Sequence, residues 1–155
     1  MAFFTSMNIV ASGMTAQQAR LDVISENITN MNTTRTEGGG AYRRKVTVMQ
    51  AESGKNGFRE AMSRAALKGR ALSNRDYEPA GGVKIVEIAE DPRELPVVYD
   101  PTHPDANEEG YVELPNVVLV KEVTDAMAAS QAFSANVTAF NALKQVTQRG
   151  LDIGV

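Results

Sequence analysis

An apolar side chain recurs every three or four residues through the first 31 residues of this 155-residue chain. The alternating spacing of four and three is the heptad pattern of a helix that buries one stripe against a partner helix. It predicts a helix from about residue 4 to 31, about 40 Å long, whose stripe is interrupted only at Gln17. The stripe consists of Phe3, Met7, Val10, Met14, Leu21, Ile24, Ile28 and Met31.

The C-terminal part of the chain carries the same pattern. It predicts a second helix from about residue 117 to 150, about 50 Å long, with Asn116 as its N-cap and Gly150 and Gly154 at its end. Its stripe consists of Leu119, Val123, Ala126, Ser130, Phe133, Val137 and Phe140, followed with a slight drift by Leu143, Val146 and Leu151.

Neither stripe can remain in water, because burial of each large apolar side chain contributes about 1.5–3 kcal/mol. Two arrangements would satisfy both stripes. The helices can pair as an antiparallel hairpin within one chain, or they can pair and still leave apolar faces for other chains. The spacing alone does not decide between these arrangements.

The middle of the chain is predicted to form short strands. Residues 41–50 alternate at Tyr42, Val46 and Val48, and residues 82–89 form the clearest strand. Shorter strands are expected at 95–99 and 111–114, and a short helix at 58–72. We therefore expect an α+β fold, with long N- and C-terminal helices that form a coiled-coil hairpin and a small, mainly β central subdomain. The expected divisions are 1–34, 35–116 with a basic insert at about 51–80, and 117–155.

The net charge of −3 hides an uneven distribution. Residues 35–75 hold ten basic and three acidic residues, whereas residues 76–116 hold two basic and eleven acidic residues. The two ends of the chain are nearly neutral. A basic stretch can bind nucleic acid, but an acidic stretch of similar size follows at once. Pairing of the basic stretch with the acidic one, within the chain or between neighbouring chains, explains this distribution more simply than nucleic-acid binding does. Each charge run can also be a solvated face.

The composition argues against an enzyme. The chain has no cysteine and one histidine, so it cannot assemble thiol catalysis or the usual zinc sites. His103 stands in an acidic, proline-bounded turn, where Asp100 and Asp105 are expected to form local turns with the backbone rather than to bind a metal. We expect no catalytic residue, no metal and no cofactor. Gly38–Gly40 lacks the following Lys-Ser/Thr of a phosphate loop and is expected to be a hinge.

No membrane span is expected, because neither long uncharged run is apolar throughout. The first basic residue is Arg20, so the N-terminus also lacks the positive region of a secretory signal.

Two terminal stretches resemble a known family. Residues 16–33 end in Asn27-Ile28-Thr29-Asn30-Met31-Asn32-Thr33, which closely resembles the N-terminal signature of bacterial flagellar rod, hook and hook–filament junction proteins. Residues 132–143 and the ending 151–154 resemble the matching C-terminal signature. The short length and the stretches at 42–45, 82–92, 98–106 and 110–117 are similar to a proximal rod protein of this family. Glu26 departs from the family pattern, which often has a small or amide residue there.

The resemblance implies a structural subunit rather than an enzyme. Members assemble axially, with their terminal helices in the coiled-coil core of a hollow rod that crosses the periplasm and transmits torque from motor to hook. It also implies other rod proteins and further copies as partners, and export by the flagellar type III apparatus. A nucleic-acid-binding module or a helical adaptor for another partner is the alternative.

Two sets of residues are predicted to make the contacts of such an assembly. The interface of the terminal helices comprises Met7, Val10, Met14, Leu21, Ile24, Asn27, Ile28, Asn30, Asn32, Val123, Phe133, Asn136, Val137, Phe140, Asn141 and Leu143. The lateral electrostatic contacts comprise Arg43, Arg44, Lys45, Arg64, Glu87, Asp91, Glu108 and Glu109.

Overall fold

Two long helices and four short strands make up the described part of the chain. The computed structural model describes residues 2–52 and 81–153. Its elements are α1 (Ala2–Thr29), β1 (Lys45–Ala51), β2 (Val83–Glu90), β3 (Val97–Tyr99), β4 (Tyr111–Glu113) and α3 (Leu119–Ile153). The α+β prediction, with long terminal helices and small central sheets, is confirmed. The helix predicted at 58–72 and nearly all of the basic insert lie outside the described residues.

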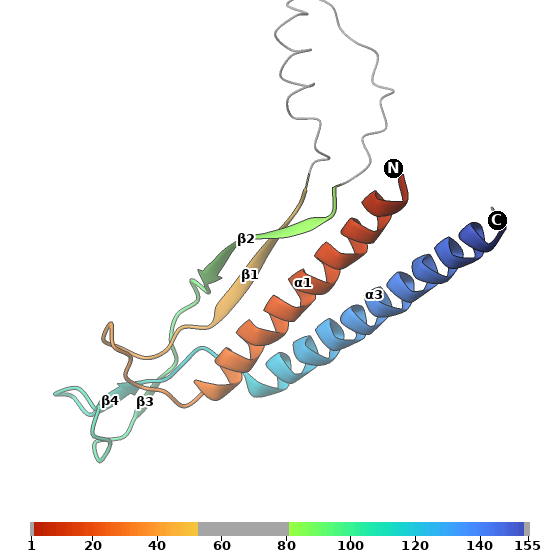
Figure 1. Cartoon of the computed structure of the whole chain (residues 1–155). Coiled ribbons are helices and arrows are strands. Elements are labelled where there is room, and N and C mark those ends of the chain that lie inside the picture. The colour runs from red at the N-terminus through yellow and green to blue at the C-terminus, as the bar shows by residue number, and fades with distance from the viewer. Residues whose placement is uncertain (1, 53–80, 154–155) are drawn as a thin grey trace, which may run out of the picture.

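The two helices lie side by side as an antiparallel pair (Figure 1). Asn27 near the end of α1 bonds to Glu122 near the start of α3, and Gly13 faces Asn136 further along the pair. The amino and carboxyl ends of the chain therefore lie at one end of the pair. None of the described helices is long and apolar enough to cross a membrane.

The inward stripe of α3 keeps Phe133 and Phe140 of the predicted one but differs from it at alternate positions. Glu122 and Ala129 are fully buried and Asn136 faces α1, whereas Val123 is 44% exposed and Ser130 is exposed. The spacing of four and three also fits the series that contains Glu122, Ala129 and Asn136. Sequence reasoning passed over this series because it includes a carboxylate and an amide, which are buried only when they are paired.

The predicted helix ends also differ. Asn116 does not cap α3, because its side-chain oxygen accepts a hydrogen bond from the Arg44 backbone N–H at 2.7 Å. Gly150 lies inside α3, which continues to Ile153. At the exit of α1, the Asn30 side chain donates to the Glu26 carbonyl oxygen at 2.9 Å. Among the described residues only glycines have a positive φ, so no asparagine of this exit adopts the left-handed conformation that often ends a helix.

Strands β1 and β2 form an antiparallel ribbon along the side of α1 that faces away from α3 (Figure 1). The register passes from Val48 opposite Glu87 to Met49 opposite Ile85, so Val86 is an extra residue, a β-bulge. Tyr42, predicted to lie in the first strand, is buried in the loop before it. Val46 and Val48 are exposed, because the alternate side chains at Lys45, Thr47 and Met49 are turned further inward.

A hydrogen bond attaches the start of β2 to α1. The Val83 backbone N–H donates to Ser12 Oγ at 3.1 Å, and the Ser12 hydroxyl donates to the Ile9 carbonyl oxygen at 2.7 Å. The preceding residue, Gly82, has a φ of +108°, and a Cβ atom there would collide with Ser12 Oγ. Only glycine brings the ribbon this close to the helix without strain.

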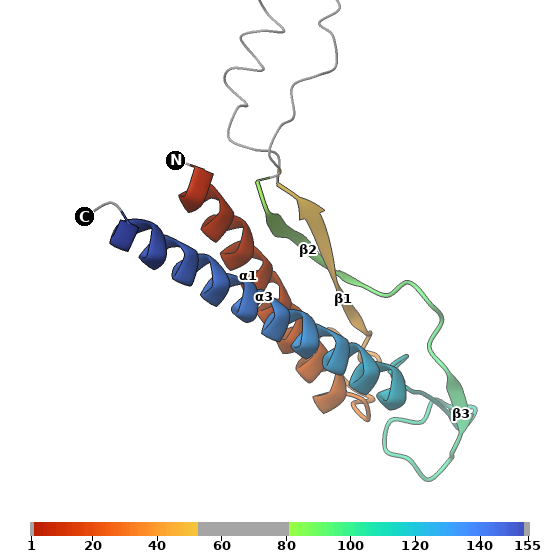
Figure 2. The same cartoon turned by 90° about the vertical axis from the view of Figure 1, so that its right-hand side faces the viewer.

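Strands β3 and β4 form a hairpin at the other end of the molecule from the two termini (Figures 1 and 2). The Tyr99 and Tyr111 rings meet edge to face, 5.2 Å between centroids. In the turn between the strands, Asp100 forms the predicted local hydrogen bond with the backbone. Its carboxylate accepts bonds from the Thr102 backbone N–H and hydroxyl at 3.0 and 2.6 Å. Asp105 instead reaches back to the loop after α1 and accepts a bond from the Thr34 hydroxyl at 2.7 Å.

The close approach at Gly82 gives a test of this arrangement. Gly82→Ala should lower the free energy of unfolding by about 2 kcal/mol or more, because it combines an unfavourable φ with a steric clash against α1. Gly150→Ala is the matched control, since a Cβ atom there meets nothing within 4 Å and should raise the stability of α3 by up to about 1 kcal/mol. Denaturant unfolding followed by circular dichroism measures both. Equal stability of the two variants would contradict the attachment.

Candidate assembly interface

Asn27, the first asparagine of the exit motif, is completely buried at the end of α1. Its side-chain nitrogen donates to the Lys45 carbonyl oxygen at 2.9 Å and to Glu122 Oε2 at 3.1 Å. Its side-chain oxygen accepts bonds from the Tyr42 hydroxyl and the Lys45 backbone N–H, both at 2.9 Å. All the hydrogen-bonding capacity of this amide is therefore used inside the chain, where it joins α1, β1 and α3.

Glu122 supplies a buried negative charge to the same cluster. Its other oxygen, Oε1, accepts a charge-assisted hydrogen bond from Arg44 Nε at 2.6 Å. The Arg44 guanidinium also lies 3.3 Å from Asp125 and 3.7 Å from Asp91. A buried carboxylate without a cation would be strongly destabilising, so Arg44 is what allows Glu122 to occupy the helix pair.

Asp91 and Asn116 close the cluster from the strand side. The Asp91 backbone N–H donates to the Arg44 carbonyl oxygen at 2.7 Å. Hydrogen bonds from Arg93 lower the pKa of the Asp91 carboxyl to about 2, so it is charged at neutral pH. Burial, followed by the charges of Glu26 and Glu122, raises the pKa of the Tyr42 hydroxyl to about 12, so this group remains a hydrogen-bond donor. We call the set Asn27, Tyr42, Arg44, Asp91, Asn116 and Glu122 the polar junction.

Sequence reasoning selected only part of the polar junction. It picked Asn27 from the motif and Arg44 and Asp91 from the charge distribution, but as contacts between chains. It missed Glu122 and the role of Tyr42. The available signal was the single acidic residue, Glu122, in a series that otherwise has helical core spacing.

The other predicted interface residues occupy three environments. Ile24 is buried. Met7, Val10, Met14, Leu21, Ile28, Asn30, Phe133, Asn136, Val137, Phe140 and Leu143 are half-buried. Asn32, Val123 and Asn141 are exposed. The helix pair therefore brings many of these residues together along its length, and it leaves most of them partly open to solvent.

The charged residues also divide between internal and open positions. Lys45 pairs with Glu26 at 2.5 Å, and Arg35 lies 3.8 Å from Asp105. Arg43, Glu87, Glu108 and Glu109 are exposed, and Arg64 lies outside the described residues. Part of the basic and acidic split is thus neutralised within one chain.

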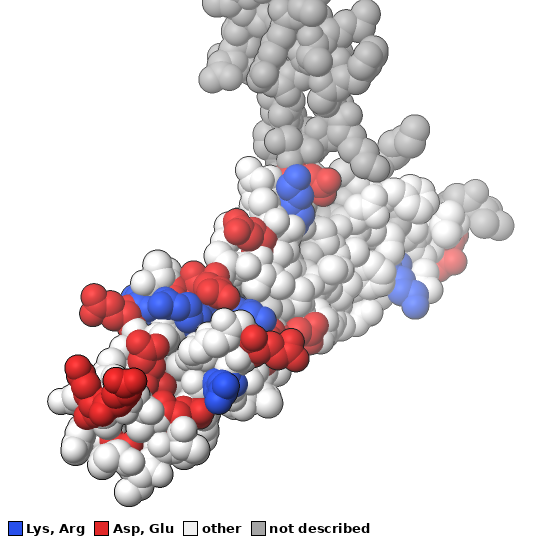
Figure 3. Space-filling model, turned by 90° about the vertical axis from the view of Figure 1, so that its left-hand side faces the viewer, with Lys and Arg blue, Asp and Glu red and all other residues white. Residues whose placement is uncertain are grey.

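Acidic residues gather at the β3–β4 end of the molecule, as Figure 3 shows for one face. The basic residues on that face lie among acidic ones, and the helix pair is mostly uncharged. No continuous basic surface is visible on this described face, so nothing on it favours a nucleic-acid interface.

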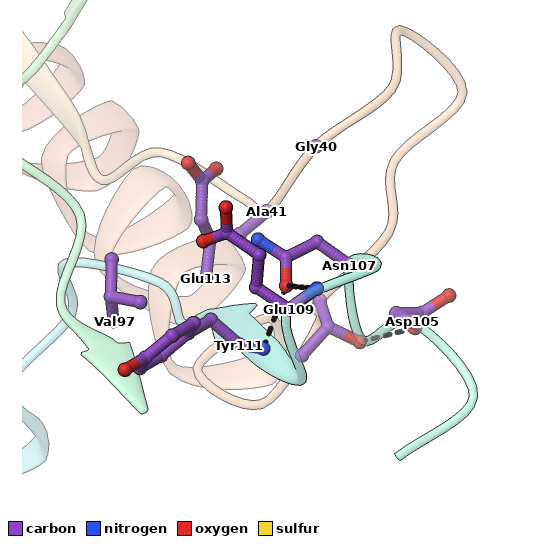
Figure 4. A pocket seen from close by; sticks show the side chains of 9 residues that line it. Gly40, Ala41, Val97, Asp105, Asn107, Glu109, Tyr111 and Glu113 are labelled. Carbon is purple, nitrogen blue, oxygen red and sulfur yellow. Dashed lines mark hydrogen bonds between the residues drawn. The ribbon is translucent and has the colours of Figure 1, made fainter. Parts of the chain in front are cut away.

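A cavity of about 470 Å³ opens beside the hairpin (Figure 4). Carboxylates of Asp105, Glu109 and Glu113 line it together with Val97 and Tyr111. The described residues contain no group of three or more His, Cys, Asp or Glu side chains placed to hold a metal ion. Asn107 next to the cavity is used structurally, since its oxygen accepts the backbone N–H groups of Glu109 and Tyr111 at 3.0 and 2.8 Å.

The two outer asparagines of the motif provide a matched test of the polar junction. Asn27→Ala should lower the free energy of unfolding by about 3–5 kcal/mol, because it leaves buried partners in three elements without hydrogen bonds. Asn32→Ala, at an exposed position of the same motif, should change it by less than about 0.5 kcal/mol. Urea unfolding of both variants measures the difference. Similar values for the two variants would show that Asn27 has no special role in the fold.

Comparisons with known proteins match both ends of the chain to flagellar families. Residues 7–35 match the family model described as flagella basal body rod protein. Residues 108–153 match the one described as flagellar basal body rod FlgEFG protein C-terminal. The hydrogen bond between Asn27 and Glu122 joins these two matched segments.

Curated relatives match over nearly the whole length. The chain is 41% identical to the flagellar basal-body rod protein FlgC of Bacillus subtilis, with 99% of each chain covered. It is 39% identical to the FlgC protein of Borreliella burgdorferi, covering 99% of this chain and 98% of that protein. It is 30% identical to that of Salmonella typhimurium, with 99% of each covered. The chain belongs to the FlgC family of flagellar basal-body rod proteins and is a structural subunit of the rod, not an enzyme.

Proposed function

We propose that this rod subunit joins its neighbours through the faces of α1 and α3 that its own helix pair leaves open. In this proposal the subunits, including further copies of this chain, form the hollow helical shaft of the proximal rod, which transmits torque from motor to hook. The interface would consist of the predicted residues from Met7 to Asn32 and from Val123 to Leu143. Asn27 would contribute indirectly, because it fixes the angle between the elements from inside the chain.

The exposure of apolar side chains along α3 carries this proposal. Val120 is 75% exposed, Val123 44%, Met127 69% and Val146 67%. The first three lie three and four residues apart, on one side of the helix. An exposed apolar stripe of this kind marks an interaction surface rather than a solvated helix face. Of the two arrangements that the sequence left open, the pair with faces left for other chains therefore has the better support.

A substitution in this stripe tests the interface without disturbing the fold. Val123→Asp should leave the isolated chain folded, because the side chain is 44% exposed, but it should abolish motility by placing a charge in the apolar contact. Ala128→Asp is the control, since Ala128 is exposed on another side of α3 and should be tolerated.

The measurements are motility and the amount of the chain in purified basal bodies. We also propose that the flagellar type III apparatus exports the chain, so the wild-type chain should reach basal bodies only in a strain with a working export gate. Normal swimming of the Val123→Asp strain would contradict the proposed interface.

We propose further that exposed charges of the middle segment set the register between neighbours. Arg43, Glu87, Glu108 and Glu109 are available for such contacts, whereas Arg44, Lys45 and Asp91 are used largely within the chain. Opposed charges at the rim of an interface give orientation and specificity more than affinity.

Association of purified rod subunits should therefore weaken as the ionic strength rises above about 0.15 M, because surface charges are then screened within about 8 Å. Light scattering over a salt titration measures this. Association that does not respond to salt would rule out the electrostatic contribution.

A further inference from the structure

A groove of about 400 Å³ lies where α1, β1 and the start of α3 meet. Its apolar lining consists of Val23, Ile24, Val46 and Met49, and its basic lining of Arg20, Arg44, Lys45 and Lys121. Asp125 also lines the groove and pairs with Arg20 and Arg44 at 3.7 and 3.3 Å. Arg44 is neutralised by the polar junction. Lys121 is exposed and has no ion pair among the described residues. The groove therefore combines apolar surface with an unpaired positive charge.

The β3–β4 hairpin presents a surface that is also apolar but carries a negative charge. Val97 and Tyr99 alternate with Val98, so they lie on one face of the hairpin together with their cross-strand partners Glu113 and Tyr111. Val97 is 57% exposed, Tyr99 63% and Tyr111 43%. The side chains of Val97, Tyr99 and Tyr111 make this face apolar, and the Glu113 carboxylate lies beside it with those of Asp105 and Glu109 in the adjoining cavity.

The hairpin cannot fill the groove of its own chain. Within the described residues it contacts neither helix and neither strand of the β1–β2 ribbon. It lies at the end of the molecule in both views of the fold (Figures 1 and 2). An isolated two-stranded hairpin of three residues a side is marginally stable in water, so this element gains from being covered.

We propose that the β3–β4 hairpin of one copy docks into the α1–β1–α3 groove of a second copy. This inference rests on the proposed function, because it names one of the contacts that would build the rod. Val97 and Tyr99 cover the apolar part of the groove, and Glu113 faces Lys121. Since the hairpin and the groove are different surfaces, the contact is heterologous and need not close, which is the property of subunits that form a helix.

The absence of cysteine from the chain makes a clean cross-linking experiment available. Val97→Cys places a thiol on the docking face of the hairpin, and Thr47→Cys places one in the groove. When the two single variants are expressed together with different tags, mild oxidation of purified basal bodies should link them into a dimer. Neither variant alone should be linked, because each copy then carries only half of the pair. A chain with both cysteines should give a ladder of larger species.

Lys144→Cys is the matched control for the groove thiol, since Lys144 is exposed further along α3 and does not line the groove. Together with Val97→Cys it should give no dimer. A dimer formed by Val97→Cys alone would show a symmetric contact and overturn the proposal. A link only to a different rod subunit would overturn the choice of a second copy as the occupant.

Charge reversal gives an independent measurement. Lys121→Glu and Glu113→Lys should each reduce the amount of the chain in basal bodies about fivefold, and the double variant should restore it. Failure of the double variant to restore incorporation would contradict the pairing of these two charges.

If the cysteine variants enter basal bodies but do not cross-link, the docking proposal fails while the proposed function stands. If the wild-type chain is absent from basal bodies, the proposed function itself fails.

Discussion

The buried carboxylate of Glu122 is the constraint on which the rest of the structure depends. A charge with no solvent exposure needs a cation and hydrogen-bond donors at fixed positions, and Arg44 and Asn27 supply them. Arg44 lies directly before β1, and Asn27 lies near the end of α1. To satisfy one side chain, the chain must therefore bring both long helices and the ribbon to one place. The polar junction specifies this geometry in a way that apolar contacts, which lack direction, do not.

Away from the polar junction, residues 2–52 and 81–153 bury little apolar surface. Among the described residues the buried apolar side chains are few, and two of them, Ala16 and Ala129, are small enough to let the helices approach closely. Many large apolar side chains remain exposed on α3, on the ribbon and on the hairpin. The described part of the molecule thus has one end whose geometry is fixed by the polar junction, and long apolar surfaces that stay open to solvent. This division suits a rod subunit, whose shape must be fixed before its contacts are made.

The sequence predicted the overall architecture because hydrophobic spacing reports directly on helices and strands. The predicted ranges of the two terminal helices and of the four strands lie close to the observed ones. The predicted stripe of α3 was wrong at alternate positions such as Val123 and Ser130, because a rule that counts only apolar residues does not select a buried carboxylate such as Glu122. The outward direction of Val46 and Val48 was missed for a related reason: alternation identifies two faces of a strand but not which one meets the helix. The junction could not be predicted, since its members are distant in sequence and meet only in the fold.

The separation between Asn27 and Glu122 has a consequence for the order in which the chain can fold. Their hydrogen bond spans 95 residues, so it is among the least local contacts of the molecule. A chain that emerges with its amino end first, from a ribosome or from a narrow channel, exposes Asn27 long before Glu122 follows. The helices can form as each segment appears, but the angle between them is set only when the start of α3 arrives. Until then the position of α3 relative to α1 and the ribbon is not fixed.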